Sequence, residues 1–428
     1  IMLAAGKSIE PYWNEYKQHT NDDNIFKTIL LSMKIGEISN YNPDKYKSSK
    51  KDPYLNDPIR SGDLIYHSIT PCNAELSRDT IMDNWITANE DWYIRNHHPV
   101  PNINIDNYCL QIEGEGLKPH CFKLEEFKSK FKEHSVITTI QCGGNRRAEY
   151  NTVDKTSGNK WGYGAISNAE WTGFYLRDIF EYIMDDLKES DNNNKNKNKN
   201  NKNIEFESYD TLKASIPSEK VFNPSGDVLI AYKMNGEDIP CDHGYPMRAI
   251  VPGYVGIRNV KWLKRIRLQE EESEGTWQRG ISYKRLAPSV KTANGIDLSK
   301  IPAMYDMPVQ SFIVENNKEK VRGIAWSGDG RGILRVEISF NKGISWTECE
   351  LKEGSEQKIG KSWAWTFWEY NKDKNNNKEK SIDNFDNINE IWCRATDTSY
   401  NIQPRDIRDI WNMRGLCNNS WNKFIVNL

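Results

Sequence analysis

One cysteine of this chain follows directly after an apolar, β-branched stretch and is itself followed by two glycines and two arginines. Residues 136–140 read Val-Ile-Thr-Thr-Ile, which is typical of a buried strand, and residues 141–147 read Gln-Cys-Gly-Gly-Asn-Arg-Arg. A thiolate suits soft or redox-active metals, glycines let the backbone approach a bulky cofactor, and guanidinium groups bind oxyanions through paired hydrogen bonds. A strand that ends at Cys142 could therefore hold a metal next to an anion. A lone cysteine is also a common small core residue, so this segment alone leaves both interpretations open.

Length and composition exclude several classes of protein. The chain has 428 residues, which is too long for one ordinary core and suggests two or three domains. Its formal net charge of −2 argues against a nucleic-acid partner, which would normally leave a basic face. No apolar run approaches the roughly 20 residues that cross a bilayer, so we expect no membrane insertion. The eight cysteines are scattered without CxxC or zinc spacing, which argues against a zinc site and a disulfide scaffold.

Hydrophobic periodicity divides the chain into an α+β region and an all-β region. Residues 52–301 mix period-2 strands with helices, and apolar residues at helical spacing predict a helix over 176–187. A strand over 228–232 runs into the hairpin-type pair Asn235-Gly236. From 302 to 428 the strands are separated by Gly and Asn turns, as in an all-β sandwich.

The all-β region is rich in aromatic residues. Its clearest predicted strands are 321–326, 333–339, 346–351, 363–369 and 391–397. Trp363, Trp365 and Phe367 alternate along one of them, and such a face could form a symmetric interface or the sandwich's own core; both interpretations stay open. Two stretches, 190–203 and 371–380, are almost pure Asn and Lys, and we expect surface insertions there, without a function.

Several sequence blocks resemble, in order, those of the sulfite oxidase family, which also contains the assimilatory nitrate reductases. These blocks are 95–101, 140–147, Trp161 with 164–167, 242–248, 251–253, 260–262, 325–328 and 410–415. Blocks that match in order over nearly the whole chain argue strongly against chance. The resemblance implies an α+β molybdopterin-binding domain of the sulfite oxidase fold at 52–301. It implies an immunoglobulin-like dimerisation domain at 302–428, and hence a homodimer.

The resemblance also implies a cofactor and its ligands. In the family, molybdenum is held by the dithiolene of one pyranopterin and by one cysteine thiolate, a role that falls on Cys142. The positions that match the family's cofactor-binding residues are Asn96, His97, Pro99, Cys142, Asp210, His243, Arg248, Asn259 and Lys261.

A small oxyanion needs charge-assisted donors around the metal. Arg95, Arg147 and Arg414 match the family's anion-binding arginines, while Trp161 matches a wall of the site and Tyr283 a hydroxyl near the metal. Three converging positive charges would also concentrate and steer anions, so we expect activity to fall with ionic strength.

The reaction that the resemblance implies is molybdenum-dependent oxidation of sulfite to sulfate with oxygen from water. Electrons would pass singly to a haem and then to a cytochrome c-type acceptor. Nitrate reduction on the same scaffold is the close alternative, but Arg414 stands where the nitrate enzymes typically have methionine. A non-catalytic molybdopterin-binding dimeric module is a further alternative, against which the retention of Cys142 and the arginines argues.

The first 38 residues resemble the C-terminal part of a cytochrome b5-like haem domain. Trp13, Tyr16 and His19 fall in its pattern, which implies His19 as an axial ligand of the haem iron; a lone surface histidine is the other interpretation. The chain begins at Ile1 without an initiator methionine, so we expect a piece of a longer protein, with residues 39–51 as a linker. We expect haem b in the intact protein but not in this fragment alone. The haem-bearing relatives imply the mitochondrial intermembrane space.

Overall fold

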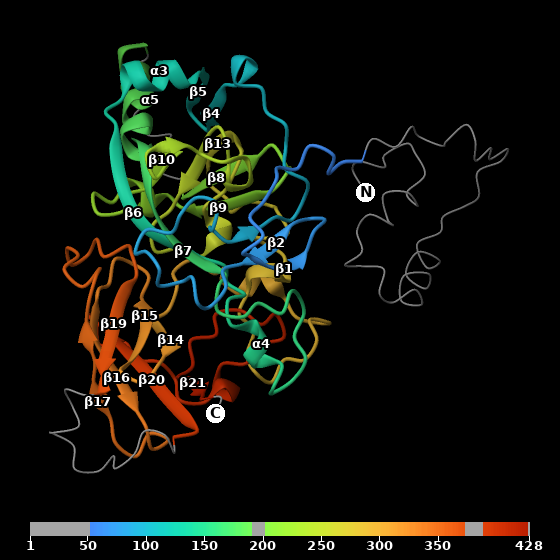
Figure 1. The fold of residues 1–428 in the computed structure, drawn as a ribbon. Coiled ribbons are helices and arrows are strands. Elements are labelled where there is room, and N and C mark those ends of the chain that lie inside the picture. Colours follow the sequence, from blue (N-terminus) through green and yellow to red (C-terminus); the bar gives the residue numbers. More distant parts are fainter. Residues whose placement is uncertain (1–51, 191–201, 373–387, 427–428) are drawn as a thin grey trace.

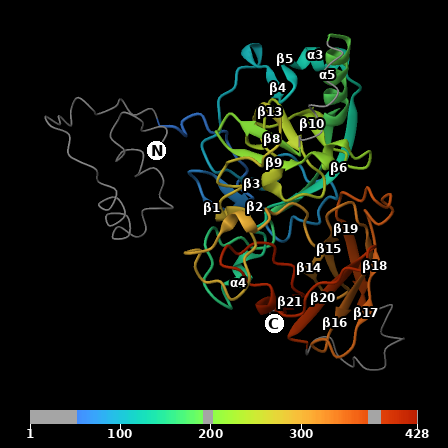
Figure 2. The ribbon, with the colours of Figure 1, turned by 180° about the vertical axis from the view of Figure 1, so that it is seen from behind.

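The computed structural model describes residues 52–190, 202–372 and 388–426. The expected haem-domain segment with His19, the linker at 39–51 and most of the insert at 190–203 lie outside these ranges. Among the described residues, none of the helices is both long and apolar enough for a membrane span. Figures 1 and 2 show an N-terminal region, coloured blue to yellow, packed on an orange and red C-terminal region.

Two five-stranded sheets and one three-stranded sheet form the N-terminal region, together with short helices. The first sheet has the order β11-β10-β7-β6 with β12 paired to β10, and consists of β6 (His134–Gln141), β7 (Ile166–Tyr175), β10 (Leu229–Met234), β11 (Glu237–Asp238) and β12 (Arg248–Ile250). The second has the order β5-β4-β13-β8-β9, and consists of β4 (Leu110–Gly114), β5 (Leu117–Phe122), β8 (Asn203–Ser208), β9 (Lys213–Pro217) and β13 (Leu263–Gln269). The third consists of β1 (Ile65–Ser68), β2 (Asn73–Glu75) and β3 (Ile94–Arg95). The helices are α3 (Leu124–Lys130), α4 (Arg147–Tyr150), α5 (Leu176–Ser190) and α6 (Ser218–Phe222). The α+β architecture predicted for this region is confirmed.

The local predictions for this region hold where the apolar pattern is strong. The helix predicted over 176–187 is α5, which buries Ile179, Phe180 and Ile183 completely. The predicted hairpin is the β10–β11 pair, in which Asn235 and Gly236 have φ angles of 52° and 84°. Positive φ at both central residues is what a type I′ turn requires.

The C-terminal region is a sandwich of two four-stranded antiparallel sheets, as predicted. One has the order β14-β15-β19-β18 and the other the order β17-β16-β20-β21. Their bounds are β14 (Gln310–Asn316), β15 (Lys320–Trp326), β16 (Ile333–Ser339), β17 (Thr347–Glu348), β18 (Glu350–Leu351), β19 (Thr366–Asn371), β20 (Glu390–Asp397) and β21 (Asn422–Ile425).

The single strand predicted over 346–351 is wrong. Its first part, β17, pairs with β16, whereas its second part, β18, pairs with β19 of the other sheet. The chain therefore crosses between the two sheets within this segment. Apolar and polar residues alternate in the same way on both sides of such a crossing, so the pattern could not show it.

The three alternating aromatic residues of the C-terminal region lie in the chain's own interior. Trp363, Trp365 and Phe367 are 4%, 0% and 7% exposed. The indole nitrogen of Trp365 donates to the carbonyl of Trp85 at 3.0 Å, and that of Trp85 donates to the carbonyl of Trp365 at 3.1 Å. Trp365 and Phe367 belong to the same apolar cluster as the N-terminal core. Of the two interpretations left open, burial within one chain therefore applies to these three residues.

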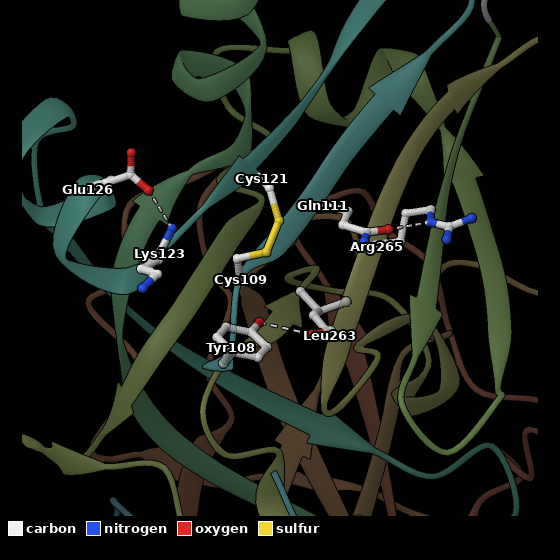
Figure 3. The surroundings of a disulfide bond; sticks show 8 residues. All are labelled: Tyr108, Cys109, Gln111, Cys121, Lys123, Glu126, Leu263 and Arg265. Carbon is white, nitrogen blue, oxygen red and sulfur yellow. Dashed lines mark hydrogen bonds between the residues drawn. A yellow bond between two sulfur atoms is a disulfide. The ribbon is translucent and has the colours of Figure 1, made fainter. Parts of the chain in front are cut away.

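A disulfide joins Cys109 to Cys121, with their Cα atoms 5.5 Å apart (Figure 3). It links the residue before β4 to β5, next to the paired residues Leu110 and Phe122. The adjacent hydroxyl of Tyr108 donates to the carbonyl of Leu263 at 2.8 Å, which ties this hairpin to β13. The scattered cysteine spacing gave no indication of this pair, although one bridge is still far from a disulfide scaffold.

Candidate active site

Cys142 follows the last residue of β6 and lies in a tight turn that leads into α4. Its backbone N–H donates to the carbonyl of Ala165 at 2.9 Å, which continues the β6–β7 ladder by one residue. The N–H of Gly144 points at the cysteine sulfur, with 3.4 Å between nitrogen and Sγ. A backbone donor of this kind stabilises a thiolate. The residue is only 5% exposed.

The sulfur lies at one wall of an open cleft of about 660 Å³, a volume that includes the space at its mouth. Several elements contribute, including the end of β6, the turn after β8, β12 and the segment 256–262. The predicted site residues that line it are Arg95, His97, Cys142, Asp210, His243, Arg248, Asn259, Lys261 and Tyr283.

Three guanidinium groups around Tyr283 are held by neutral acceptors, and of these arginines only Arg95 lines the cleft. Arg95 donates through Nη1 to Asn73 Oδ1 at 2.8 Å and to the carbonyl of Asn96 at 2.7 Å. Arg147 donates through Nε to the carbonyl of Gly415 at 3.1 Å and through Nη1 to the carbonyl of Asn159 at 2.9 Å. Arg414 donates through Nη1 to Ser157 Oγ at 2.8 Å.

None of these three arginines forms an ion pair with a carboxylate in the described ranges, and all their hydrogen-bond partners there are neutral. Arg147 interacts electrostatically with Cys142, Tyr283, Arg95 and Arg414. Burial lowers the pKa of Arg147 and of Arg414, and the charge of Arg95 lowers both further. A partly buried positive charge without a carboxylate partner is costly unless an anion binds to it. The structure thus brings together three arginines that lie far apart in the sequence.

Tyr283 lies at the centre of this charged cluster. It ends the short 3-10 helix Ile281–Tyr283 and is 7% exposed. Burial raises its pKa to about 12, and the electrostatic interaction with Cys142 acts in the same direction. The phenol therefore stays protonated at neutral pH and can donate a hydrogen bond into the cleft.

Glycines surround the guanidinium of Arg147 and leave room for it. A Cβ at Gly144 would lie 2.5 Å from Arg147 Nη2, and one at Gly158 would lie 2.8 Å from Nη1. A Cβ at Gly415 would lie 2.6 Å from Arg147 Cγ, and Gly415 also has a φ of 57°. Side chains at these three positions would displace the arginine, so the glycines fix where its charge lies.

Trp161 is placed differently from the arginines. It is 1% exposed, and its ring lies edge-on to His67 with 4.8 Å between the centroids. Its carbonyl accepts a hydrogen bond from Ala148 N at 3.0 Å, which anchors the start of α4. Among the described hydrogen bonds and ring contacts, none joins Trp161 to Arg95, Arg147 or Arg414.

At another wall of the cleft, Lys261 is held by a polar network. Its Nζ donates to the carbonyl of Asp242 at 2.7 Å and to Asn96 Oδ1. Asn96 in turn donates to Asp242 Oδ1 at 2.8 Å, and Arg60 forms an ion pair with Asp242 at 2.7 Å. Burial of the ammonium group lowers the pKa of Lys261 to about 7. Asn96 therefore supports Lys261 from behind and does not itself line the cleft.

The guanidinium of Arg248 has two nitrogens bonded to backbone carbonyls and one nitrogen without a partner among the described residues. Its Nη1 and Nη2 donate to the carbonyls of His243 and Asn259, each at 2.8 Å. Its Nε is buried and has no partner among the described residues. A buried donor left free in this way is a place for an acceptor atom of a ligand.

His243 is a neutral imidazole in this setting. Burial lowers its pKa to about 3, although Asp242 acts in the opposite direction. Its Nε2 lies 3.1 Å from the carbonyl of Asn89, which can only accept a hydrogen bond. The proton is therefore on Nε2, and Nδ1 is free to accept.

Three predicted residues remain, namely Asp210, in the turn after β8, His97 and Pro99. Asp210 accepts from Leu212 N at 3.1 Å and lies 3.3 Å from His98 Nδ1. Burial acts to raise the pKa of Asp210, but His98 together with hydrogen bonds from Ser208 and Leu212 lowers it more, so the net shift is downward. The ring of His97 lies edge-on to Trp277 at 5.1 Å. Pro99 does not line the cleft.

The sequence interpretation missed the residues that hold the arginines and part of the cleft wall. Asn73, Ser157 and Asn159 contribute neutral acceptors from segments outside the matching blocks. Tyr93 and Trp262 also line the cleft. Tyr93 lies just before the block 95–101 and Trp262 inside the block 260–262, so these blocks were the available signal.

Comparisons with known proteins agree with this architecture. Residues 97–277 match the model of the oxidoreductase molybdopterin binding domain, and residues 302–428 match that of the Mo-co oxidoreductase dimerisation domain. The mitochondrial sulfite oxidase of Rattus norvegicus is 38% identical over all of this chain and 76% of its own length. The sulfite oxidase of Gallus gallus is 35% identical over 99% of this chain and 90% of its length.

More distant proteins share part of this likeness. The NADH nitrate reductase of Spinacia oleracea is 32% identical, but the match covers 84% of this chain and 40% of that enzyme. The solved structure of the sulfane dehydrogenase SoxCD from Paracoccus pantotrophus superposes with a TM-score of 0.64 at 22% identity, covering 96% of this chain and 100% of that one. At this identity the structural match shows a shared fold.

Proposed function

Because the chain belongs to the sulfite oxidase family of molybdopterin oxidoreductases, we propose that it oxidises sulfite to sulfate at a molybdenum–molybdopterin centre, with oxygen taken from water. The observation that carries this proposal is the cluster of Arg95, Arg147 and Arg414 around Tyr283, held by neutral acceptors only, with Arg147 in electrostatic contact with Cys142. Sulfite and sulfate are small oxyanions, and each would supply the negative charge that these arginines lack.

The residues of the cleft fit a molybdenum–pterin cofactor. The Cys142 sulfur, which receives the Gly144 N–H, would bind the metal, and the donors of Lys261 and Arg248 would hold the polar end of the pterin. When bound, molybdenum supplies the two-electron redox change and the site of oxygen transfer. His243, Asn259 and Asp210 line the same cleft and offer acceptors and donors for a fused ring edge.

The chain's own contribution to the reaction is binding and electrostatic stabilisation. The three guanidiniums orient the oxyanion in front of the Cys142 side of the cleft and stabilise the charge on its oxygens through the reaction. The protonated phenol of Tyr283 adds a neutral donor that does not cancel this field. Because all these groups are fixed before substrate arrives, little reorganisation is needed during the reaction.

Nitrate reduction on the same scaffold remains the second candidate. Arg414 is in electrostatic contact with Arg95 and Tyr283, so this position contributes a third positive charge to the site. A methionine at position 414, as is typical of the nitrate enzymes, would leave only two positive charges, those of Arg95 and Arg147. The positive charge at 414 favours the sulfite assignment.

Assembly, electron transfer and location extend this proposal. We infer a molybdopterin-binding domain at 52–301 and a dimerisation domain at 302–428, through which the chain forms a homodimer. We further propose a haem b, with His19 as one ligand, as the first electron acceptor in the intact protein, and a cytochrome c as the next. The mitochondrial relatives support a mitochondrial location, and we propose the intermembrane space.

A steady-state assay of purified, metal-analysed protein tests the assignment. We expect sulfite oxidation with an artificial electron acceptor, abolished in Cys142→Ser and weakened in Arg414→Met. Nitrate turnover in the absence of sulfite turnover would overturn the choice of substrate.

A further inference from the structure

Arg414 reaches the arginine cluster on a loop of the C-terminal region, between the 3-10 helix Ile407–Asp409 and β21. This loop is anchored by the segment that follows Cys142. The hydroxyl of Tyr150 lies 3.1 Å from the carbonyl of Ile410, and the indole nitrogen of Trp411 donates to the carbonyl of Asp154 at 3.1 Å. Figures 1 and 2 show α4 next to the red C-terminal segment. The position of Arg414 thus depends on contacts made by residues 147–159.

Within that segment, the tripeptide Ser157-Gly158-Asn159 contacts two of the three arginines. Asn159 accepts from Arg147 through its carbonyl, and Gly158 leaves the space that the Arg147 guanidinium fills. Ser157 accepts from Arg414 through its hydroxyl at 2.8 Å. These three consecutive residues therefore fix the positions of both the Arg147 and the Arg414 guanidinium groups.

The hydroxyl of Ser157 is itself fixed on both sides. It can donate to the carbonyl of Met413, 3.3 Å away, while it accepts from Arg414 Nη1. The backbone N–H of Ser157 donates to the same carbonyl at 3.0 Å. The backbone hydrogen bond from Ser157 to Met413 thus holds the loop that carries Arg414, while the Ser157 hydroxyl holds the Arg414 guanidinium.

Nothing else in the described ranges fixes the direction of the Arg414 side chain by hydrogen bonding. Its Nε is buried without a partner, and it forms no ion pair there. Arg95 repels it electrostatically. A long side chain in this situation loses much rotamer freedom when it binds an anion, unless a contact already holds it in place.

We propose that Ser157 is a positioning residue for the oxyanion site, whose hydroxyl pre-orients Arg414 toward the anion. The inference rests on the proposed function for its substrate, but it concerns anion binding and not the redox step. Since Ser157 is exposed and water can partly replace its hydroxyl, we expect Ser157→Ala to weaken oxyanion binding about fivefold to tenfold.

The test compares four full-length proteins with equal molybdenum content: wild type, Ser157→Ala, Ser157→Thr and Thr152→Ala. Thr152 is a matched control, because its exposed hydroxyl lies in the same segment and, among the described residues, bonds only to the carbonyl of Glu149, at 2.7 Å. Two quantities are measured for each protein, the kcat and KM for sulfite and the Kd for sodium sulfate by calorimetry. Ser157→Ala should raise KM and the sulfate Kd together, with kcat within about twofold of wild type. Ser157→Thr and Thr152→Ala should match wild type in both.

A double-mutant comparison separates positioning from a general loop effect. In an Arg414→Met background, Ser157→Ala should cause no further change in the sulfate Kd, because the group it orients is gone. The same loss in that background, or wild-type sulfate binding in Ser157→Ala, overturns the inference. If the wild type fails to oxidise sulfite but Ser157→Ala still weakens sulfate binding through Arg414, the proposed function fails and the positioning role stands.

Discussion

Replacing Gly415 by alanine should displace Arg147 and thereby test whether the geometry of the arginine cluster matters. A Cβ at Gly415 would lie 2.6 Å from Arg147 Cγ, whereas ordinary contacts of this kind begin at 3.4 Å. The arginine stem must therefore retreat by about 1 Å, and a shift of that size at a binding group costs on the order of 100-fold in rate. We expect kcat/KM for sulfite to fall by about that factor.

The matched control for this variant is Gly360→Ala. Gly415 and Gly360 have φ angles of 57° and 80°, so alanine suffers a left-handed backbone cost of roughly 1 kcal/mol at either position. No atom of the described residues lies within 4 Å of a Cβ at Gly360. The assay is steady-state sulfite oxidation with an artificial acceptor, alongside chemical unfolding of both variants. Wild-type kcat/KM in a folded, molybdenum-loaded Gly415→Ala protein would refute the reasoning.

Three further predictions concern charge, pH and the disulfide. Raising the ionic strength should lower kcat/KM for sulfite, because salt screens the arginine cluster, and Arg414→Met should show a weaker salt dependence; equal slopes for the two proteins would contradict this. Because burial lowers the folded-state pKa of His243 to about 3 from 6.5, the unfolded chain takes up the proton first as the pH falls. The contribution of this group to the free energy of unfolding is therefore fully present above pH 6.5 and declines toward pH 3 by up to about 4 kcal/mol. The variant His243→Gln lacks this contribution, so its free energy of unfolding, measured with urea, should depend less on pH in the accessible part of that window. Replacing both Cys109 and Cys121 by serine opens a loop with a sequence separation of 12 and should reduce the free energy of unfolding by about 3 kcal/mol, while KM for sulfite stays unchanged.

Local periodicity predicted the elements that carry Cys142 and the surrounding core. The strand before Cys142 and the helix that begins at Leu176 both follow from runs of apolar residues, because each element buries a continuous apolar face. The split between β17 and β18 could not be predicted in this way, since it depends on which sheet each short segment joins. The burial of Trp365 against Trp85 depends on the packing of two regions, which no local pattern contains.

The candidate site was accessible to sequence reasoning only through the ordered family blocks. Arg95, Arg147 and Arg414 are separated by many residues, and each alone resembles an ordinary surface arginine. The blocks indicated which arginines to consider, but not that their partners would be neutral. Asn73, Ser157 and the other acceptors act largely through single hydrogen bonds made possible by the fold, and such contacts leave no spacing pattern in the sequence.

The most direct test of the account is the sulfur coordination of molybdenum, measured by X-ray absorption on purified wild type and on Cys142→Ser. The account predicts that the wild-type metal has one protein sulfur ligand in addition to those of the pterin, and that the variant lacks it and does not oxidise sulfite. An identical sulfur shell in the two proteins would contradict the central claim that the Cys142 thiolate holds the metal beside the arginine cluster.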